Sequence, residues 1–449
     1  MYSVSNYYYN NYNTVKSVKA TPVKNDGSVK ESKTSYMTNP VMTQVPFNAA
    51  LTASNLRTSL SSKDEKNKYN ELQKIADRET KKQLNFLLKT GVLLNSASND
   101  NSTTLDNLFK IASTQRAEGL SNANILKETV SILYDPHVIT QQFGNIPQQY
   151  QAQVSSMTNE DANVDHSGTC VASSIEFNLA QKHPAEFARF AEGLSSPSMA
   201  VQKNIKLKNL SDNTLDAIWL LNAFEIPYEA NNFDEAKLKF APDKNAIVRA
   251  HIQTVDKDPL ERSSVDVLMQ STFMQVGSQQ SYDSLSDKRA GKFNQSDKGL
   301  IEFEKTFTES VVEDKNKISV TYQTVDENAK LVGYETDFNT MKKQITDALS
   351  MGENVIIGYT QVDGTNTIIN GHEITIIGTK TDRNGKMIFV CNDTDDNVAK
   401  PIEYPEDYLL PKIHHAALPQ SVVGNDVNIV ENWVQGLQTY KELKQKQAA

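Results

Sequence analysis

The chain has 449 residues, of which 38% are apolar, and its formal net charge at pH 7 is -9. The apolar fraction is below the roughly 45–50% of ordinary globular proteins, so we expect part of the chain to be unstructured and the rest to bury a core. The 46 Lys and Arg residues are spread along the chain and are not gathered with aromatic residues, which excludes nucleic-acid binding.

The amino terminus and the cysteine content bear on localisation. No run of about 18 or more apolar residues occurs, so no membrane-spanning helix is expected. The first residues lack a basic segment followed by an apolar one, so we expect no standard secretory signal and take the cytoplasm as the default location. Export by a route that needs no such signal stays open. The two cysteines, Cys170 and Cys391, do not make a disulfide framework.

The first part of the chain changes character near residue 61. Residues 1–60 are polar, rich in Asn and Tyr, and without sustained periodicity, which predicts a disordered segment. Residues 61–150 are predicted to form a small helical module and a linker, because apolar residues recur at helical spacing within about 62–91, 104–116 and 122–133. The module is either a packing or spacer domain or a regulatory segment within residues 1–150 that contacts the functional site.

Residues 151–425 are predicted to form the main domain, with an insertion at about 195–335. Residues 426–449 are predicted to form a C-terminal helix. An Asn384-Gly385 pair predicts a tight hairpin turn between two of the strands. The predicted helices lie at about 170–182, 185–193, 213–224 and 338–349, and the predicted strands at about 246–252, 318–322, 355–359, 374–379, 387–391 and 401–404.

Cys170 is the first candidate for chemistry, because it lies where a polar, glycine-containing turn runs into an apolar helical pattern. The amino terminus of a helix carries partial positive charge, and a nearby imidazolium adds more, so both lower the pKa of a thiol. Among seven histidines, His372 is the best candidate for that imidazole, since it follows Gly371 and begins an apolar strand. A cysteine and a histidine arranged in this way favour nucleophilic catalysis.

The neighbouring strand ends at Asn392-Asp393, and an acceptor there would bond the His372 ring and fix its tautomer. Successive side chains on a strand point to opposite faces, so only one of these two residues is expected to reach His372 directly. Both stay candidates on this argument. Cys391, between Val390 and Asn392, is interpreted as buried and inert.

This order of a helix-borne cysteine, a strand-borne histidine and a polar residue resembles the papain-like cysteine peptidases. Residues 371–378, Gly-His-Glu-Ile-Thr-Ile-Ile-Gly, look like the histidine strand of that superfamily. Residues 392–394 and 402–408 look more like its bacterial branch, which includes the double-glycine leader peptidases and transglutaminase-like proteins. In that branch an aspartate takes the third position, which implies Asp393, whereas the papain pattern implies Asn392. The resemblance covers residues 163–182 and 340–410.

The chain also departs from the papain pattern. Residues 167–171 read Ser-Gly-Thr-Cys-Val, where the papain type has Cys-Gly-Ser/Ala-Cys-Trp/Tyr, and Cys170 and His372 are 202 positions apart. The family's oxyanion glutamine lies a few residues before the cysteine, but position 164 is Val. Asn163 or Gln153 is the candidate side-chain donor, and the backbone amide of Cys170 is the other.

The resemblance implies an α+β, papain-like domain, with helices on one side and an antiparallel sheet that carries His372 and Asp393 or Asn392. We predict a thiol-dependent hydrolase that cleaves a peptide or protein substrate. The same triad supports transglutaminase, deamidase or acyltransferase chemistry, and a non-catalytic interaction protein with this fold is the remaining alternative. We expect no cofactor and no metal, because no Cys-x-x-Cys or His-x-x-x-His pair occurs. The pair His414-His415 is interpreted as a solvated loop.

Overall fold

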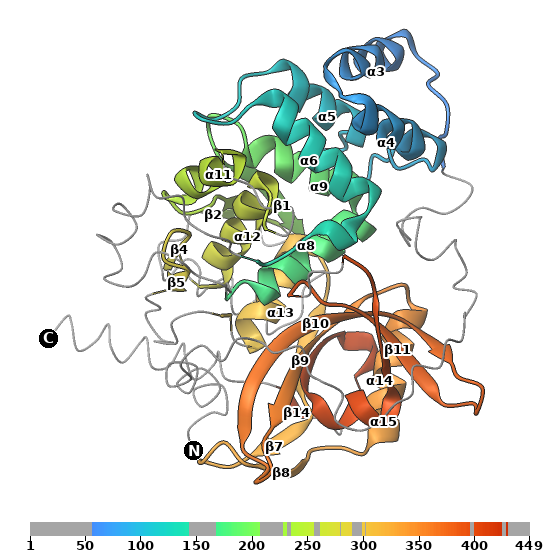
Figure 1. Cartoon of the computed structure of the whole chain (residues 1–449), viewed down its shortest axis with the longest axis vertical. Coiled ribbons are helices and arrows are strands. Elements are labelled where there is room, and N and C mark those ends of the chain that lie inside the picture. Colours follow the sequence, from blue (N-terminus) through green and yellow to red (C-terminus); the bar gives the residue numbers. More distant parts are fainter. Residues whose placement is uncertain are drawn as a thin grey trace, which may run out of the picture.

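A layer of helices and a curved antiparallel sheet make up the described part of the chain (Figure 1). The computed structural model describes residues 56–142, 168–206, 228–230, 235–255, 261–278, 280–289, 299–300, 302–395, 399–423 and 428–429. The predicted disordered segment therefore lies almost wholly outside the described residues, and so do the predicted helix at 213–224 and residues 430–449. Among the described helices, none combines the length and the apolar composition needed to cross a membrane.

Four helices form the amino-terminal part of the helical layer, each begun by a side chain that caps its free backbone amides. Ser62, Asp77, Thr103 and Ser121 each accept a hydrogen bond from a backbone N–H in the first turn of the helix that follows. The predicted helical stretch at 62–91 is two helices, because Asp77 starts a new one. The four helices are α3 (Lys63–Ile75), α4 (Arg78–Lys89), α5 (Thr104–Ser113) and α6 (Asn122–Tyr134).

The helix that begins at Cys170, α8 (Cys170–Lys182), runs through the centre of this layer. Eleven of its thirteen residues are buried, which is the pattern of a helix packed on every side. Its neighbours include α9 (Pro184–Leu194) and α12 (Ser264–Gly277), and α11 (Ala246–Val255) packs on α12. Apolar residues of α4, α5 and α6 join those of α8, α9 and α12 in one continuous core, so the amino-terminal helices and the Cys170 helix pack together.

The predicted strand at 246–252 is wrong, because these residues lie in α11. Its buried positions are Ala246, Arg249, Ala250, Ile252 and Gln253, and all but Ile252 follow the spacing of a single helix face. A short run that contains Ile and Val cannot be assigned by periodicity alone, and packing against α12 decides for the helix. A small antiparallel sheet lies nearby, with β3 (Glu235–Phe240) between β1 (Val201–Lys206) and β2 (Tyr228–Ala230).

In the described part of the chain, the main sheet has seven strands in the order β12-β11-β10-β9-β13-β6-β14, and every neighbouring pair is antiparallel. The predicted strands in the last third of the chain are confirmed, and the hairpin at Asn384-Gly385 joins two of them. The strands are β6 (Lys317–Thr321), β9 (Val355–Val362), β10 (Ile368–Thr381), β11 (Met387–Asn392), β12 (Ile402–Pro405), β13 (Ile413–Pro419) and β14 (Asn428–Ile429).

Strand β13 was not predicted, and it corrects the interpretation of His414-His415 as a solvated loop. Both histidines are buried in the sheet, His414 completely and His415 with 6% of its surface exposed. Residues Asn428–Ile429 pair with β6, so the segment predicted as a C-terminal helix contributes a strand at its start. Both errors concern strands whose pairing partners lie far away in the chain.

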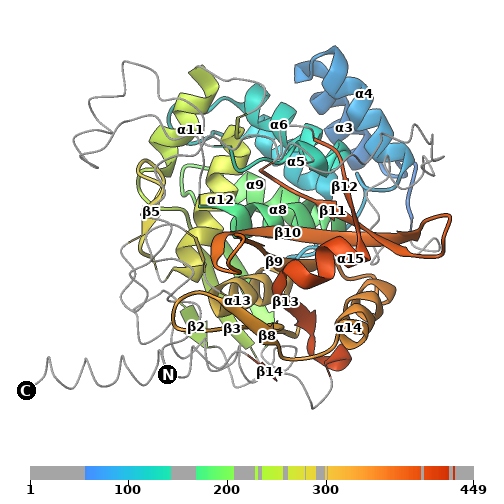
Figure 2. The same cartoon turned by 60° about the horizontal axis from the view of Figure 1, so that its bottom comes forward.

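The sheet separates two cores. In β9, Ile356 packs in the core that contains α8, whereas Ile357 packs with Met341 and Ile345 of α14 (Phe338–Ser350). This alternation explains why β9 reads as a continuous apolar run, since both faces of the strand are covered. Helix α13 (Glu302–Glu313) contacts α8 and the sheet strands β6 and β13. Figure 2 shows β10 as a long strand between the layer that contains α8 and the part that contains α14 and α15 (Glu406–Leu409).

Candidate active site

Cys170 is the first residue of α8, and it is only partly buried although nearly all of the helix behind it is covered. The turn before it is held in place by two distant elements. The Gly168 N–H donates to Asp287 Oδ2 at 2.5 Å, and the Thr169 hydroxyl donates to Gln270 Oε1 of α12 at 2.9 Å. The Thr169 side chain makes no capping hydrogen bond to the helix. The adjoining side chain therefore does not cap the first-turn amides of α8, at the positive end of the helix where Cys170 lies.

His372 lies in β10 opposite Tyr359 of β9, and its carboxylate partner is Asp393, directly after the end of β11. His372 Nε2 is 2.7 Å from Asp393 Oδ1, and the two side chains are 17% and 15% exposed. The bond at Nε2 leaves Nδ1 as the ring nitrogen available to another group. Of the two neighbouring candidates, Asp393 is therefore the one that bonds the ring.

Asn392 lies inside the sheet and does not take part in this contact. It pairs with Thr375 of β10 and is 3% exposed. Its Nδ2 makes no hydrogen bond to any of the described residues. The two adjacent residues point in different directions, as the alternation of a strand requires.

Asp393 and Cys170 together set the protonation of the His372 ring. Burial lowers the pKa of His372, because it penalises the charged ring. The charge of Asp393 and its hydrogen bond act in the opposite direction, and a hydrogen bond with the Cys170 side chain adds to them. The net result is a pKa well above the usual value, so the imidazolium form is favoured beside the thiol. Cys170, His372 and Asp393 thus form one interacting group from three distant segments.

The loop that carries Asp393 is anchored on both sides. The Thr394 hydroxyl hydrogen-bonds the Ser173 hydroxyl of α8 at 2.7 Å, so the loop is tied to the same helix that presents Cys170. The Asp395 N–H donates to Asp393 Oδ1 at 3.0 Å, which directs the carboxylate. A carboxylate held in this way keeps the His372 ring in one orientation.

Residues 140–142, which follow the amino-terminal helices, hold the other side of this loop. The Gln141 N–H donates to the Thr394 carbonyl at 2.9 Å, and the side-chain amides of Gln141 and Gln142 donate to Asp395 Oδ1 at 3.0 and 2.9 Å. The sequence analysis missed these residues and Ser173. A serine inside an apolar helix was a weak signal for Ser173, but nothing local marks Gln141 or Gln142.

Three tyrosines and a lysine lie beside the histidine strand. The Tyr359 and Tyr408 hydroxyls are 2.9 Å apart, and the Tyr404 ring stacks on Tyr408 with centroids separated by 5.5 Å. The Lys412 ammonium lies 4.9 Å from the centre of the Tyr408 ring. Burial raises the pKa of both Tyr359 and Tyr404, so neither hydroxyl ionises near neutral pH. This group forms an aromatic wall in which Lys412 carries the charge.

The structure also bears on the other residues that the sequence analysis singled out. The candidate oxyanion donors Asn163 and Gln153 lie outside the described residues, whereas the backbone amide of Cys170 begins α8. Cys391 is completely buried, and burial raises the pKa of its thiol, which agrees with its interpretation as inert. One group that can hold a metal ion lies elsewhere in the described part, at Glu302, His414 and His415.

Comparison with known proteins adds no further constraint: no protein-family model, no curated protein and no solved structure matches this chain.

Proposed function

We propose that the chain is a thiol-dependent hydrolase of the papain-like type that cleaves peptide bonds with Cys170, His372 and Asp393. The observation that carries the proposal is the meeting of these three side chains, from the start of α8, from β10 and from the end of β11, with the 2.7 Å bond between His372 and Asp393. A helix that presents a cysteine against an antiparallel sheet that presents a histidine and an aspartate is also the arrangement that the resemblance to papain-like peptidases implies.

In the first half-reaction, the thiolate of Cys170 attacks the carbonyl carbon of the substrate. An imidazolium beside the sulfur favours the thiolate, which is the nucleophilic form. The negative charge that develops on the carbonyl oxygen is stabilised by the Cys170 backbone N–H at the positive end of α8. His372 then gives its proton to the leaving nitrogen, the C–N bond breaks, and a thioester to Cys170 remains.

In the second half-reaction, neutral His372 takes a proton from water, and the resulting hydroxide attacks the thioester carbonyl. The C–S bond breaks, the carboxylic acid leaves, and the thiolate and the imidazolium are restored. Asp393 holds the ring so that the same nitrogen serves both steps, and it stabilises the positive charge of the protonated ring.

The chain offers an internal control for a test of this pair, since it has one partly exposed and one buried cysteine. The rate of alkylation by iodoacetamide would be followed against pH by peptide mass spectrometry. We expect Cys170 to react at pH values well below the free-thiol pKa of about 8.5, and Cys391 to stay protected until the protein unfolds. In His372→Ala, the low-pH reactivity of Cys170 should disappear. Reaction of Cys170 that follows a free thiol, or that is indifferent to His372, would exclude the proposed pair.

A second assay separates hydrolysis from the other acyl-transfer reactions. The chain would be incubated with a mixed peptide library, with and without a primary amine, and the products identified by mass spectrometry. Cleaved peptides support a peptidase, amine adducts of glutamine support a transglutaminase, and conversion of glutamine to glutamate supports a deamidase. If an activated Cys170 gives none of these products, a binding role for the domain becomes the better explanation.

A further inference from the structure

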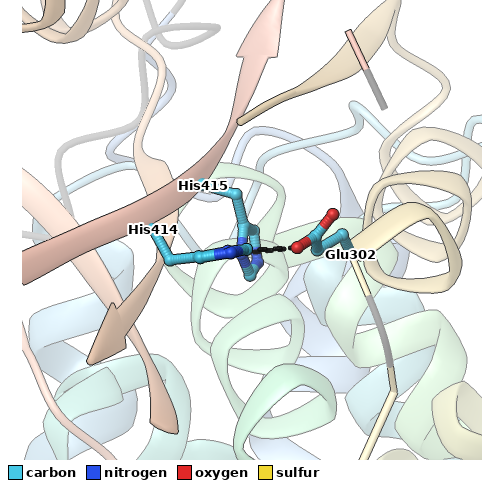
Figure 3. A group of neighbouring side chains, drawn as sticks. All are labelled: Glu302, His414 and His415. Atoms are coloured by element: carbon cyan, nitrogen blue, oxygen red, sulfur yellow. Dashed lines mark hydrogen bonds and ion pairs between the residues drawn. The ribbon is translucent and has the colours of Figure 1, made fainter. Parts of the chain in front are cut away.

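A second cluster of ionisable side chains is buried between α13 and the middle of the sheet (Figure 3). Glu302 is the first residue of α13, and His414 and His415 are the second and third residues of β13. The three side chains are between 0% and 7% exposed. Figure 3 shows both imidazole rings meeting one oxygen of the carboxylate, so the cluster has a single centre.

Two adjacent residues of a regular strand point to opposite faces, and their convergence here therefore needs an irregularity. The pairing of β13 with β9 shifts register between Ile413 and His415, so His414 is an extra residue at this point. Such a bulge redirects a side chain. The irregularity allows both rings to lie against Glu302.

The three converging atoms are two imidazole nitrogens and a carboxylate oxygen. His414 Nδ1 and His415 Nδ1 lie 3.0 and 3.5 Å from Glu302 Oε1, and the two nitrogens are 2.8 Å apart. A single proton on one nitrogen can serve only one of these contacts at a time, whereas a metal ion accepts a lone pair from all three atoms. Tetrahedral zinc, with bonds of about 2.0–2.1 Å, holds its ligand atoms roughly 3.3 Å apart, which lies between the shortest edge (2.8 Å) and the longest edge (3.5 Å) of this triangle.

The surroundings of His415 are those of a metal ligand. Glu373 Oε1 lies 3.0 Å from His415 Nε2, the ring nitrogen that faces away from the cluster, and Lys305 Nζ lies 3.2 Å from the other oxygen of Glu373. A histidine that binds a metal almost always donates its second N–H to a carboxylate or carbonyl, which fixes the tautomer. Glu373 lies at ion-pair distance from that nitrogen of His415, and the two groups are not aligned as a hydrogen bond. Glu302, Glu373 and Lys305 together carry a net charge of -1, which favours a cation.

Gly358 of β9 makes room for this arrangement. It pairs with both Glu373 of β10 and His415 of β13, so it lies between them on the sheet. The His415 ring occupies the space where a side chain at position 358 would start, and a Cβ there would overlap it. The absence of a side chain lets the ring reach across β9 to Glu373.

We infer that Glu302 Oε1, His414 Nδ1 and His415 Nδ1 bind one divalent transition-metal ion, zinc first among them, with Glu373 as the orienting carboxylate of His415. Two imidazoles and one carboxylate suit zinc and its first-row neighbours, whereas calcium and magnesium require more oxygen ligands. The ion would join α13 to β13 and, through Glu373, to β10 beside His372. Its role is structural, because the ligands are buried and none of them belongs to the triad.

The test measures metal binding by the full-length chain without a polyhistidine tag, in a Cys170→Ala background so that the thiol cannot bind the metal. The protein is stripped with a chelator, and Zn²⁺ is returned in competition with a chromophoric chelator. We expect one ion per chain, and Co²⁺ should give the intense visible absorption of a tetrahedral site. Glu302→Gln, which keeps the shape of the side chain, should abolish stoichiometric binding, and Glu373→Gln should weaken it by about 10–100-fold.

His137→Gln is the matched control, since His137 also contacts a carboxylate, Asp135, at 3.0 Å but belongs to no three-ligand group among the described residues. It should bind the metal like the parent. Folding of each variant is checked by circular dichroism, and Glu373→Gln decides the test if Glu302→Gln does not fold. A folded parent that binds no Zn²⁺ would overturn the inference. Equal affinity in the parent and the glutamine variants would overturn it too, because the ion would then lie elsewhere.

Discussion

Two histidine sites lie on the same sheet and differ in what surrounds them. His372 bonds one carboxylate, Asp393, and meets a thiol at the partly exposed start of α8. His414 and His415 share one carboxylate, Glu302, and are closed off from solvent. A histidine with a nucleophile and access to solvent is suited to moving protons. Two histidines with a buried carboxylate and no nucleophile are suited to holding a cation.

The largest effect should come from the loss of Cys170, the thiol that the first site has and the second site lacks. Cys170→Ala removes the proposed nucleophile, and we expect the rate of product formation to fall by about 10⁴-fold or more, because a triad without its nucleophile keeps only the contribution of binding and the oxyanion site. Cys391→Ala, at the buried cysteine, should keep the rate of the parent. Activity that survives in Cys170→Ala would assign the reaction to another residue.

The second effect tests the role of the carboxylate at the first site. Asp393→Asn removes the charge that raises the pKa of His372, so the alkaline limb of the pH–rate profile should move to lower pH and the rate should fall. Asn392→Ala, one residue earlier, should leave the limb in place, because Asn392 does not bond the ring. If the alkaline limb of the pH–rate profile moved in Asn392→Ala but not in Asp393→Asn, the assignment of Asp393 as the third residue of the triad would be contradicted.

The raised pKa of His372 also affects the stability of the folded chain. The pKa of folded His372 lies above its ordinary value of 6.5, so protonation favours the folded state. This contribution is complete below pH of about 6.5 and is lost as the pH rises through the folded-state pKa. Urea unfolding against pH should show that loss in the parent and a flatter curve in Asp393→Asn.

At the second site, the expected effect is on stability and not on chemistry. A ligand that binds only the folded state at about 100 times its dissociation constant adds about 2.7 kcal/mol, so Zn²⁺ should raise the Tm of the stripped chain by several degrees. Glu302→Gln should abolish this rise and His137→Gln should preserve it. An equal rise in Glu302→Gln would place the stabilising ion away from the cluster.

A smaller effect on stability is expected from a change at Gly358, which packs against the His415 ring of the second site. Gly358→Ala sets a Cβ against the His415 ring, and we expect the free energy of unfolding to fall by about 1–3 kcal/mol, as for other overpacked positions. Gly333→Ala is the matched control, because a Cβ at Gly333 of β8 (Leu331–Tyr334) meets no atom within 4 Å. Denaturant unfolding measures both. Similar values for the two variants would mean that His415 moves aside without loss.

The first site was predictable from the sequence because each part has a local signature. Cys170 follows a turn that leads into an apolar helix, and an Asn-Gly turn makes the strands with His372 and Asn392-Asp393 antiparallel neighbours. The choice between Asn392 and Asp393 was not predictable from residues alone, because it depends on the exact register. The register of β10 and β11 shifts between Ile376 and Gly378, and no sequence pattern marks that shift.

The second site was missed because nothing local predicts it. His414 and His415 stand between Pro411 and Pro419, which favours a loop, and their convergence depends on a bulge opposite β9. Their carboxylate partner, Glu302, lies more than a hundred residues earlier in the chain. Only the packing of α13 on the sheet brings it near. The same tertiary packing made a helix of residues 246–252, which periodicity alone had assigned to a strand.

The smallest effect concerns the bond that joins the loop of Asp393 to the helix of Cys170. Ser173→Ala and Thr394→Val each remove one hydroxyl of the 2.7 Å pair, and a buried hydrogen bond contributes about 1 kcal/mol. If the bond positions Asp393, the rate should fall by about fivefold in each variant, while the alkaline limb of the pH profile stays in place. The double variant should lose little more than either single one, because the two hydroxyls form one interaction. Additive losses would show that each hydroxyl acts through other partners, such as the Gln141 side chain beside Thr394, and that the helix and the loop are positioned independently.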